Sequence, residues 1–397
     1  MVENKDKKVL NVPNLRFKEF EGEWEKTTFG NIATGFDYGM NAAAKSYDGE
    51  NKYIRITDID ESSSTYVDKD VVSPDGMLSD NFLVKEQDIL LARTGASTGK
   101  TYLYRKSDGK LYYAGFLIRA NVTTHNPYFL FCQLHTHRYW RWVSIMSARS
   151  GQPGINSQEY SSFPVFTTSI QEENKIAKLL SLLDERISTQ TKIIDKLQSL
   201  IKGISNKLLN MDNGIPICLG EILTERLDRT KKNNQHEILS STVKGIFSQR
   251  EYFSKDIASE NNIGYKVIHL HDIVLSPQNL WMGNINFNDK FDIGIVSPSY
   301  KVFSIADGFD KKYVAALLKT HHALYNYMLV SEQGASIVRR NLNYEAFEQL
   351  VFKIPSLNKQ REIGHALSLL KSRLENANLL IKTYNSQKQF MLRQMFI

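Results

Sequence analysis

The sequence lacks several features that mark common classes of protein. It holds two cysteines among 397 residues, Cys132 and Cys218, which make neither a disulfide framework nor a zinc site. No apolar run approaches the ~20 residues of a membrane-spanning helix. The charged residues near the N-terminus are not followed by an apolar signal-peptide core. We therefore expect a cytoplasmic protein that has no membrane contact.

Motifs for catalysis or cofactor binding are also scarce. Residues 95–101 resemble a phosphate-binding loop, but three residues instead of four separate the two glycines, and a strand follows instead of a helix. Residues 126–129 (Asn-Pro-Tyr-Phe) resemble the catalytic loop of amino-methyltransferases, but one proline is missing and no glycine-rich cofactor loop precedes them. Two close histidine pairs, His135 with His137 and His321 with His322, have no carboxylate or cysteine at ligand spacing. We expect no catalytic residue and no metal site.

What the sequence does contain is a heptad pattern that occurs twice. In residues 171–210, apolar residues recur in steps of four and three with no proline, which is typical of a coiled-coil helix, and Gln190 occupies the one polar step. The helix-pairing residues of the first copy are Ile176, Leu180, Leu183, Ile187, Ile194, Leu197 and Ile201. Those of the second copy, which begins 187 positions later and is broken only at Lys388, are Ile363, Leu367, Leu370, Leu374 and Ile381.

The position of the two copies favours pairing within one chain. Each helix has about 40 residues and is roughly 60 Å long. The heptads alone also permit homodimerisation. Because a whole module separates the two copies, we instead predict an antiparallel intramolecular coiled coil.

The segments that precede the two helices share an order of elements. Residues 29–32 (Phe-Gly-Asn-Ile) correspond to residues 219–222 (Leu-Gly-Glu-Ile), and a buried strand from Asp88 corresponds to one from Asp272. In the first copy a helix begins after Asn126, its expected cap, and runs to about Ser147. A glycine loop and a last strand follow in both copies. The sequence thus predicts an α/β (α+β) protein with an internal repeat.

The charge of the chain favours an anionic partner. The net charge is +7, which points first to nucleic acid. Arginine and glutamine make the bidentate contacts to guanine and adenine, so we expect base contacts from residues 93–101, 149–156, 277–284 and 334–341. The candidate DNA-binding residues are Arg93, Lys100, Arg138, Arg141, Arg149, Gln152, Lys244, Gln278, Asn279, Arg339 and Arg340. Alternatively, Tyr139 and Trp142 pack in the core and the arginines beside them are merely solvated.

The order module–helix–module–helix resembles the specificity (S) subunit of type I restriction-modification systems, over essentially the whole chain from Val12. The resemblance is carried by residues 12–17 (Val-Pro-Asn-Leu-Arg-Phe), residues 164–177 and, most specifically, residues 354–363 (Ile-Pro-Ser-Leu-Asn-Lys-Gln-Arg-Glu-Ile). One departure is that residues 280–283 (Leu-Trp-Met-Gly) replace the compact Gly-x-x-x-Gly turn of the first module. This difference suggests that the modules read different sequences.

The resemblance implies a division of labour along the chain. Two tandem target-recognition domains, at residues 14–169 and 214–355, would each contact one half of a split site on double-stranded DNA. The segments at 170–213 and 356–397 would be spacer helices related by a pseudo-two-fold axis, and residues 1–13 an N-terminal tail. The helices would dock two methyltransferase (M) subunits together with restriction (R) subunits. S-adenosylmethionine and adenine-N6 methylation would belong to the M subunits, leaving this chain with no cofactor and no active site.

Two other functions stay open on the sequence. A self-contained DNA methyltransferase or nucleotide-binding enzyme would need a cofactor loop, and tight binding of S-adenosylmethionine or ATP by the isolated chain would reveal it. A coiled-coil scaffold would have the same heptads, but its complex would show no salt-dependent binding to duplex DNA.

Overall fold

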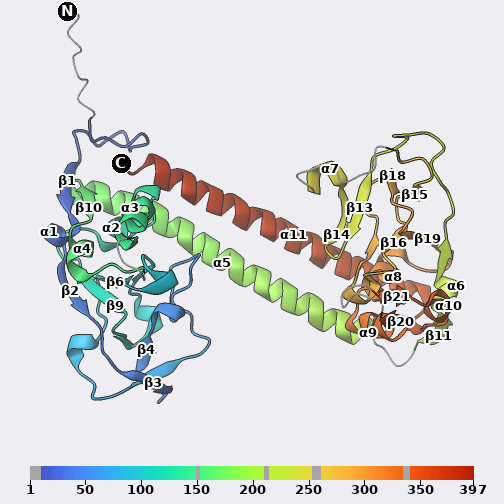
Figure 1. Ribbon diagram of the computed structural model, residues 1–397, viewed down its shortest axis with the longest axis horizontal. Helices are drawn as coiled ribbons and strands as arrows, with labels where there is room; N and C mark the ends of the chain where they lie inside the picture. Colours follow the sequence, from blue (N-terminus) through green and yellow to red (C-terminus); the bar gives the residue numbers. More distant parts are fainter. Residues whose placement is uncertain (1–9, 149–152, 210–213, 253–260, 334–339) are drawn as a thin grey trace, which may run out of the picture. The chain divides into compact units, whose positions relative to one another are not determined.

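The computed structural model describes residues 10–148, 153–209, 214–252, 261–333 and 340–397, and the side chains of these residues except 208, 209 and 333. The chain forms two compact units (Figure 1). Unit 1 contains residues 1–190 and 380–397, and unit 2 contains residues 191–379. Both long helices pass from one unit into the other, so each unit holds part of each helix.

The elements of unit 1 alternate short strands with short helices before the first long helix. The strands are β1 (Glu25–Thr28), β2 (Thr34–Tyr38), β3 (Ala43–Ser46), β4 (Lys52–Ile54), β5 (Val72–Asp75), β6 (Asp88–Ala92), β7 (Thr101–Leu103), β8 (Leu111–Tyr113), β9 (Leu117–Asn121) and β10 (Pro164–Thr167). The helices are α1 (Phe29–Ile32), α2 (Pro127–Gln133), α3 (His137–Ser147), α4 (Ser157–Ser161) and the long α5 (Ile170–Leu209), with single 3-10 turns that include η3 (Gly95–Ser97).

A four-stranded antiparallel sheet, in the order β2-β9-β6-β7, forms the centre of unit 1. Strand β6 is completely buried, as its unbroken apolar run predicts. One side of the sheet packs on α2 and α3 through Phe129, Tyr139 and Phe163, and the end of the chain enters the same core through Phe396. The unit therefore folds around residues from both ends of the chain.

Unit 2 repeats this plan. Its strands are β11 (Ile215–Cys218), β12 (Leu223–Glu225), β13 (Leu239–Thr242), β14 (Gly245–Ser248), β15 (Lys266–His269), β16 (Ile273–Leu275), β17 (Ile285–Phe287), β18 (Ile293–Val296), β19 (Lys301–Ile305), β20 (Ser331–Gln333), β21 (Arg340–Leu342) and β22 (Val351–Ile354). Its helices are α6 (Leu219–Ile222), α7 (Gln249–Tyr252), α8 (Lys311–Leu317), α9 (His321–Leu329), α10 (Tyr344–Glu348) and the long α11 (Leu357–Gln394), with the 3-10 turn η5 (Leu280–Met282).

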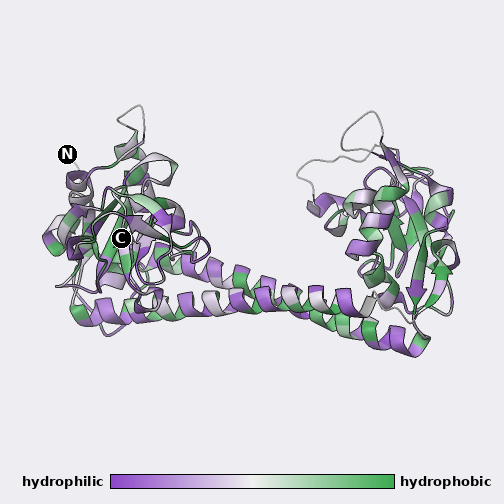
Figure 2. Ribbon diagram, turned by 90° about the horizontal axis from the view of Figure 1, so that it is seen from below, coloured by the Kyte–Doolittle hydropathy of each residue, from purple (hydrophilic) through white to green (hydrophobic). Residues whose placement is uncertain are grey.

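The central sheet of unit 2 has the order β12-β19-β16-β17, which matches the sheet of unit 1 strand for strand. Strand β11 pairs with β22 just as β1 pairs with β10. The peripheral strands differ, because β4 and β8 are parallel in unit 1 whereas β15 and β18 are antiparallel in unit 2. The predicted duplication is confirmed in the central sheet, and the two units differ in the strands outside that sheet. In Figure 2 hydrophobic residues concentrate on the inner strands of each unit.

Burial along the long helices follows the predicted heptads. On α5, Ile176, Leu180, Leu183 and Ile194 are buried, and the other predicted pairing residues are half-buried. On α11, Ile363 and Leu367 are buried, and Leu370, Leu374 and Ile381 are half-buried.

The pairing partners agree with an antiparallel arrangement within each unit. In unit 1, α5 residues Ile176 and Leu180 share a core with Leu392, in the last turn of α11, and with Met395, the residue that follows the helix. In unit 2, Ile204 packs on the core that contains Ile363 and Leu367. Lys388, the polar residue that interrupts the second heptad pattern, also has a partner on the other helix. Its Nζ lies 2.6 Å from Asp184 Oδ1.

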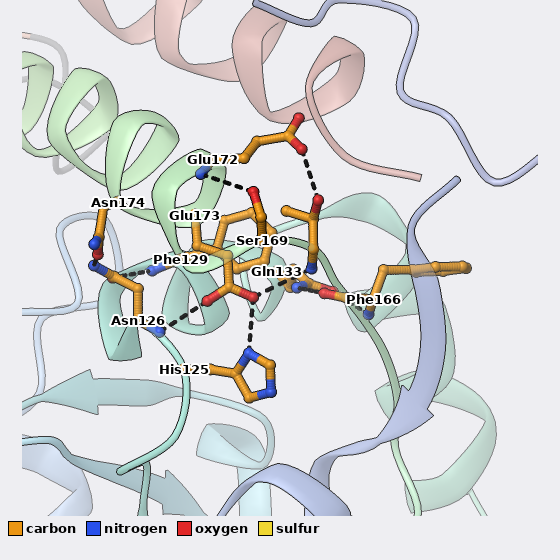
Figure 3. A network of polar contacts seen from close by, with 10 residues as sticks. His125, Asn126, Phe129, Gln133, Phe166, Ser169, Glu172, Glu173 and Asn174 are labelled. Carbon is orange, nitrogen blue, oxygen red and sulfur yellow. Dashed lines mark hydrogen bonds and ion pairs between the residues drawn. The ribbon is translucent and has the colours of Figure 1, made fainter. Parts of the chain in front are cut away.

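Buried polar residues fix the start of α5 in unit 1 (Figure 3). The Glu173 carboxylate accepts hydrogen bonds from Asn126 N (2.9 Å) and Thr168 N (3.3 Å) and contacts His125 Nδ1 (2.9 Å). Glu172 accepts two 2.7 Å hydrogen bonds from the Arg16 guanidinium. Both glutamates are fully buried. Acidic residues in the first turn also favour the positive end of the helix dipole.

The same contact in unit 2 uses an amide. Gln360, in the first turn of α11, accepts a 2.9 Å hydrogen bond from Asp310 N and donates one to Pro355 O. Asn126 and Asp310 are the N-caps of α2 and α8. Each long helix is thus tied to the cap of the equivalent short helix in its unit.

The structure corrects the predicted helix after Asn126. It is two helices, α2 and α3, because the Thr136 side chain starts a new helix by accepting from Tyr139 N and donating to Gln133 O. Short α4 was not predicted. The two cysteines are free, with Cys132 buried and Cys218 half-buried. Among the described residues, none of the helices is long and apolar enough to span a membrane.

Candidate nucleic-acid interface

In unit 1 a turn follows the buried strand β6 and lies against the segment that leaves the first glycine loop. We call residues 93–99 the reading turn of unit 1. Its Gly95 N donates to Pro153 O (3.0 Å), and Ile155 N donates to Arg93 O (2.9 Å). Thr94 and Gly154 form a β-bridge. Two of the loops that the sequence predicts as base readers are therefore neighbours, although they are far apart in the sequence.

Arg93 occupies the first position of this turn and is half-buried. Its guanidinium lies over the Tyr38 ring at 4.7 Å from the centroid, and within the described residues its Nε has no hydrogen-bond partner. Tyr38 is itself 42% exposed, and its hydroxyl accepts from Ser157 N at 3.3 Å. A stacked arginine has its direction fixed while its remaining N–H groups can still donate.

Lys100 follows the turn and is also half-buried. Its Nζ is 3.8 Å from Glu61 Oε2, and this glutamate side chain is 86% exposed. An ion pair at that distance with such an exposed partner contributes little. The lysine can therefore exchange this partner for a phosphate.

Unit 2 has the corresponding arrangement. We call residues 276–283 the reading turn of unit 2, because they follow the buried strand β16 as residues 93–99 follow β6. Arg340 N donates to Gln278 O (3.1 Å), which joins this turn to the strand after the second glycine loop. The Arg340 guanidinium lies 4.8 Å from the centroid of the Trp281 ring, and its Nε has no partner in the described part of the chain. Each unit therefore pairs a stacked arginine with a reading turn.

The two turns share a shape despite their different sequences. Each contains one 3-10 turn, η3 or η5, and closes on a glycine with a left-handed backbone, Gly99 at φ +91° or Gly283 at φ +90°. A β-carbon on Gly99 would lie 2.7 Å from Val143 of α3, and one on Gly283 would lie 3.3 Å from Leu324 of α9. Glycine is needed at both positions for its backbone conformation and for its small size.

The remaining candidate residues have different surroundings. Gln278 is exposed on the reading turn of unit 2, and Asn279 is half-buried beside it. Lys244 is exposed at the turn between β13 and β14, and Arg141 is exposed on α3. Their contact with DNA stays a prediction.

Arg138 has partners inside unit 1. Its guanidinium lies over Phe166 and Phe163 and donates to Gln133 Oε1 at 3.1 Å. Burial lowers the pKa of Arg138 to about 10. Tyr139 lies in the core, as the structural alternative for this stretch predicts, but Arg138 is packed and hydrogen-bonded instead of solvated. Arg149, Gln152 and Arg339 lie outside the described residues.

Sequence reasoning missed the aromatic platforms and the anchors of the turns. Tyr38 and Trp281 come from different positions in their units, so no repeat in the sequence relates them. Tyr139 hydroxyl and Lys319 ammonium hold the backbone of Gly99 and Gly283, respectively. Nothing in the spacing of these residues shows that they reach the two turns.

The fold defines a class of protein with two modules of similar architecture and two long helices that are shared between them. Residues 22–199 match the family model of the type I restriction modification DNA specificity domain. This match agrees with the resemblance of the sequence to the specificity (S) subunits of type I restriction-modification systems.

One solved structure supports the fold, and a second similarity is weaker. The chain is similar to the S subunit of a type I restriction-modification system from M. genitalium, with a TM-score of 0.65 and 14% sequence identity over 97% of this chain and 99% of that chain. An HsdS subunit from Thermoanaerobacter tengcongensis is 12% identical over 94% of this chain and 96% of that chain, with a TM-score of 0.39.

Proposed function

We propose that this chain is the DNA-specificity subunit of a type I restriction-modification complex, and that units 1 and 2 each read one half of a split DNA target. The observation that carries the proposal is the turn after the equivalent buried strand, β6 or β16, which is joined to a stacked arginine in both units. Arg93 belongs to the turn of unit 1, and Arg340 reaches the turn of unit 2 from β21. Arginine can donate two hydrogen bonds to guanine in the major groove. Because the neighbouring side chains differ between the turns, the two half-sites are expected to differ in sequence.

In this proposal the long helices hold the two reading units and dock the modification subunits. Both helices continue from one unit into the other, so their length sets the separation of the half-sites. Each also carries large apolar residues outside the pairing seam that are at least 40% exposed. These residues are Ile170, Leu182, Ile193, Leu200, Leu369, Leu379, Leu380 and Phe390. They suit contacts with two M subunits, and R subunits would join the same complex.

The chemistry of methylation would reside in the partners. The M subunits would bind S-adenosylmethionine and transfer its methyl group to adenine N6, while this chain would position the DNA without catalysing a step. Basic residues around the reading turns would contact phosphates, so affinity should fall as salt rises.

The test is adenine-methylation mapping in a methylation-free host that expresses the chain with its M subunit. We expect a split motif that disappears when this chain is omitted. Replacing residues 14–169 with those of another S subunit should change one half-site only. Matched heptad insertions in α5 and α11 should lengthen the spacer and leave the half-sites unchanged.

Three outcomes would contradict the proposal. Methylation that persists without this chain would place specificity elsewhere. No motif from an assembled complex would favour a scaffold that does not contact DNA. Methylation by the isolated chain would show that it is a self-contained enzyme.

A further inference from the structure

The reading turns are anchored at the same backbone atom by different side chains. In unit 1 the Tyr139 hydroxyl donates to Gly99 O at 2.8 Å. In unit 2 the Lys319 ammonium donates to Gly283 O at 2.7 Å. Both glycines close their turns with a left-handed backbone, so each carbonyl is fixed at the point where the turn enters the next strand.

The anchor of unit 1 consists of neutral hydroxyl groups. Tyr139 is fully buried. A second buried tyrosine, Tyr160, accepts from Gly99 N at 3.2 Å and donates to Ala92 O at 2.6 Å. The two tyrosines together hold both ends of the turn. Burial keeps the pKa of Tyr139 well above its ordinary value, so this anchor does not change charge at neutral or mildly alkaline pH.

The anchor of unit 2 is a half-buried cation at the centre of a polar network. Lys319 Nζ also donates to Asn286 Oδ1 at 2.9 Å. The Asn286 amide in turn donates to Ser241 Oγ and Thr242 O, each at 2.7 Å. Ser241 and Thr242 belong to β13, whose hairpin with β14 presents Lys244 at its turn. One ammonium group therefore ties the reading turn to a second candidate DNA contact.

We propose that Lys319 is a positioning residue for the reading turn of unit 2, and that it performs there the task that Tyr139 performs in unit 1. This inference rests on the proposed function. The two half-sites are then read through turns of the same shape, one held by charge-assisted hydrogen bonds and the other by neutral ones. Charge-assisted bonds are roughly twice as strong as neutral ones.

The charge of this anchor is sensitive to pH. Burial and, to a smaller extent, the nearby Lys371 of α11 together lower the pKa of Lys319 to about 8. Lys371 is itself faced by Asp289 and Glu375. Above about pH 8 the Lys319 amine can still donate, but without the positive charge. We therefore expect the two hydrogen bonds that orient the turn of unit 2 to weaken in alkaline solution, although loss of the buried charge raises the free energy of unfolding over the same range. The turn of unit 1 is unaffected.

The experiment measures base discrimination separately at each half-site, using the assembled complex of the full chain with its M subunits. Affinity is measured for duplexes with the mapped target and for duplexes with one base changed in either half-site, and the replacement of residues 14–169 assigns the half-sites to the units. Lys319→Met should reduce discrimination at the unit 2 half-site about tenfold, the size of one lost charge-assisted hydrogen bond. Tyr139→Phe is the matched control and should reduce discrimination at the other half-site only, by about threefold.

A measurement on the unaltered complex does not depend on whether the variants fold. Between about pH 7 and about pH 9, discrimination should fall at the unit 2 half-site and stay constant at the unit 1 half-site. Equal pH dependence at both half-sites would contradict the inference. Lys319→Met with unchanged discrimination, or with equal loss at both half-sites, would assign the lysine to stability alone. The absence of any split motif for the unaltered complex would instead contradict the proposed function.

Discussion

Units 1 and 2 place hydrogen-bonding groups at equivalent positions but use different chemical groups. At the start of the long helix, unit 1 has the Glu173 carboxylate where unit 2 has the Gln360 amide, and both accept a hydrogen bond from a helix-cap backbone N–H. At the reading turn, Tyr139 in unit 1 corresponds to Lys319 in unit 2. A buried backbone group needs a partner, but the partner need not have a particular charge. The duplicated architecture can therefore persist while the charges inside it diverge.

The largest difference between the units should appear at the helix starts. Glu173→Ala leaves Asn126 N and Thr168 N without their acceptor and His125 without its buried partner, so we expect a loss of about 4 kcal/mol in the free energy of unfolding. Gln360→Ala removes a neutral acceptor and should cost about 1 kcal/mol. Urea unfolding of the full chain, followed by a probe in each unit, measures both. Equal losses of unfolding free energy in the two variants would show that the Glu173 carboxylate stabilises its unit no more than the Gln360 amide does.

The closing glycines should show a smaller difference in the same direction. Gly99→Ala combines a left-handed backbone with a 2.7 Å approach to Val143, so we expect a loss of about 3 kcal/mol. Gly283→Ala has the same backbone but a 3.3 Å approach to Leu324, and should cost about 1.5 kcal/mol.

Matched controls separate strain from crowding in this comparison. Gly95 and Gly264 have φ of +68° and +82° and nothing within 4 Å of an added β-carbon. Alanine at either position reports the cost of the backbone alone. If Gly95→Ala destabilises the chain as much as Gly99→Ala in thermal unfolding, packing against α3 does not explain the glycine.

The smallest expected effect is a difference in pH dependence. His135 in unit 1 and Lys319 in unit 2 each directly precede the threonine that caps the next helix, and burial lowers the pKa of His135 to about 4 and that of Lys319 to about 8. The unfolded chain has ordinary pKa values of about 6.5 and about 10.4, so it binds more protons than the folded chain between each pair of values. Each difference of about 2.5 pKa units corresponds to about 3 kcal/mol before solvent screening, which reduces it. Stability should therefore rise with pH from about 4 to about 6.5 in unit 1 and from about 8 to about 10.4 in unit 2, by about 1–2 kcal/mol each.

Each variant serves as the control for the other in this measurement. His135→Gln should flatten the acidic rise and Lys319→Met the alkaline one, as measured by urea unfolding across the pH range. A variant that removes neither rise, or that removes both, would show that other groups control the pH dependence.

Much of the fold followed from local patterns in the sequence. The heptads identified both long helices and the residues that face inward, because a 4-3 repeat places them on one side of a helix. The strand from Asp88 to Ala92 has the predicted bounds, because an apolar run of that length between polar turns suits a buried strand. The break at Thr136 was missed, since a threonine that caps a helix resembles any other polar residue until its hydrogen bonds are known.

The candidate interface was only partly accessible from the sequence. Arg93 and Arg340 were proposed because arginine suits base recognition, but Tyr38 and Trp281 were not linked to them. Stacking joins residues that are distant in sequence and follow no period. Arg138 was proposed as a DNA contact, but its side chain packs inside unit 1. Its aromatic neighbours Phe163 and Phe166 come from a later segment, so the residues next to Arg138 in the sequence do not reveal this packing.

The sequence by itself determined that this protein is a duplicated α/β chain with two paired helices, because periodicity and repetition are properties of the chain alone. Only the tertiary structure decided how each reading turn is held. Gly99 and Gly283 adopt the same backbone, yet one is anchored by a tyrosine from α3 and the other by a lysine that precedes α9. Such contacts depend on which side chains the fold brings within about 3 Å of a backbone carbonyl, and no local pattern specifies that distance.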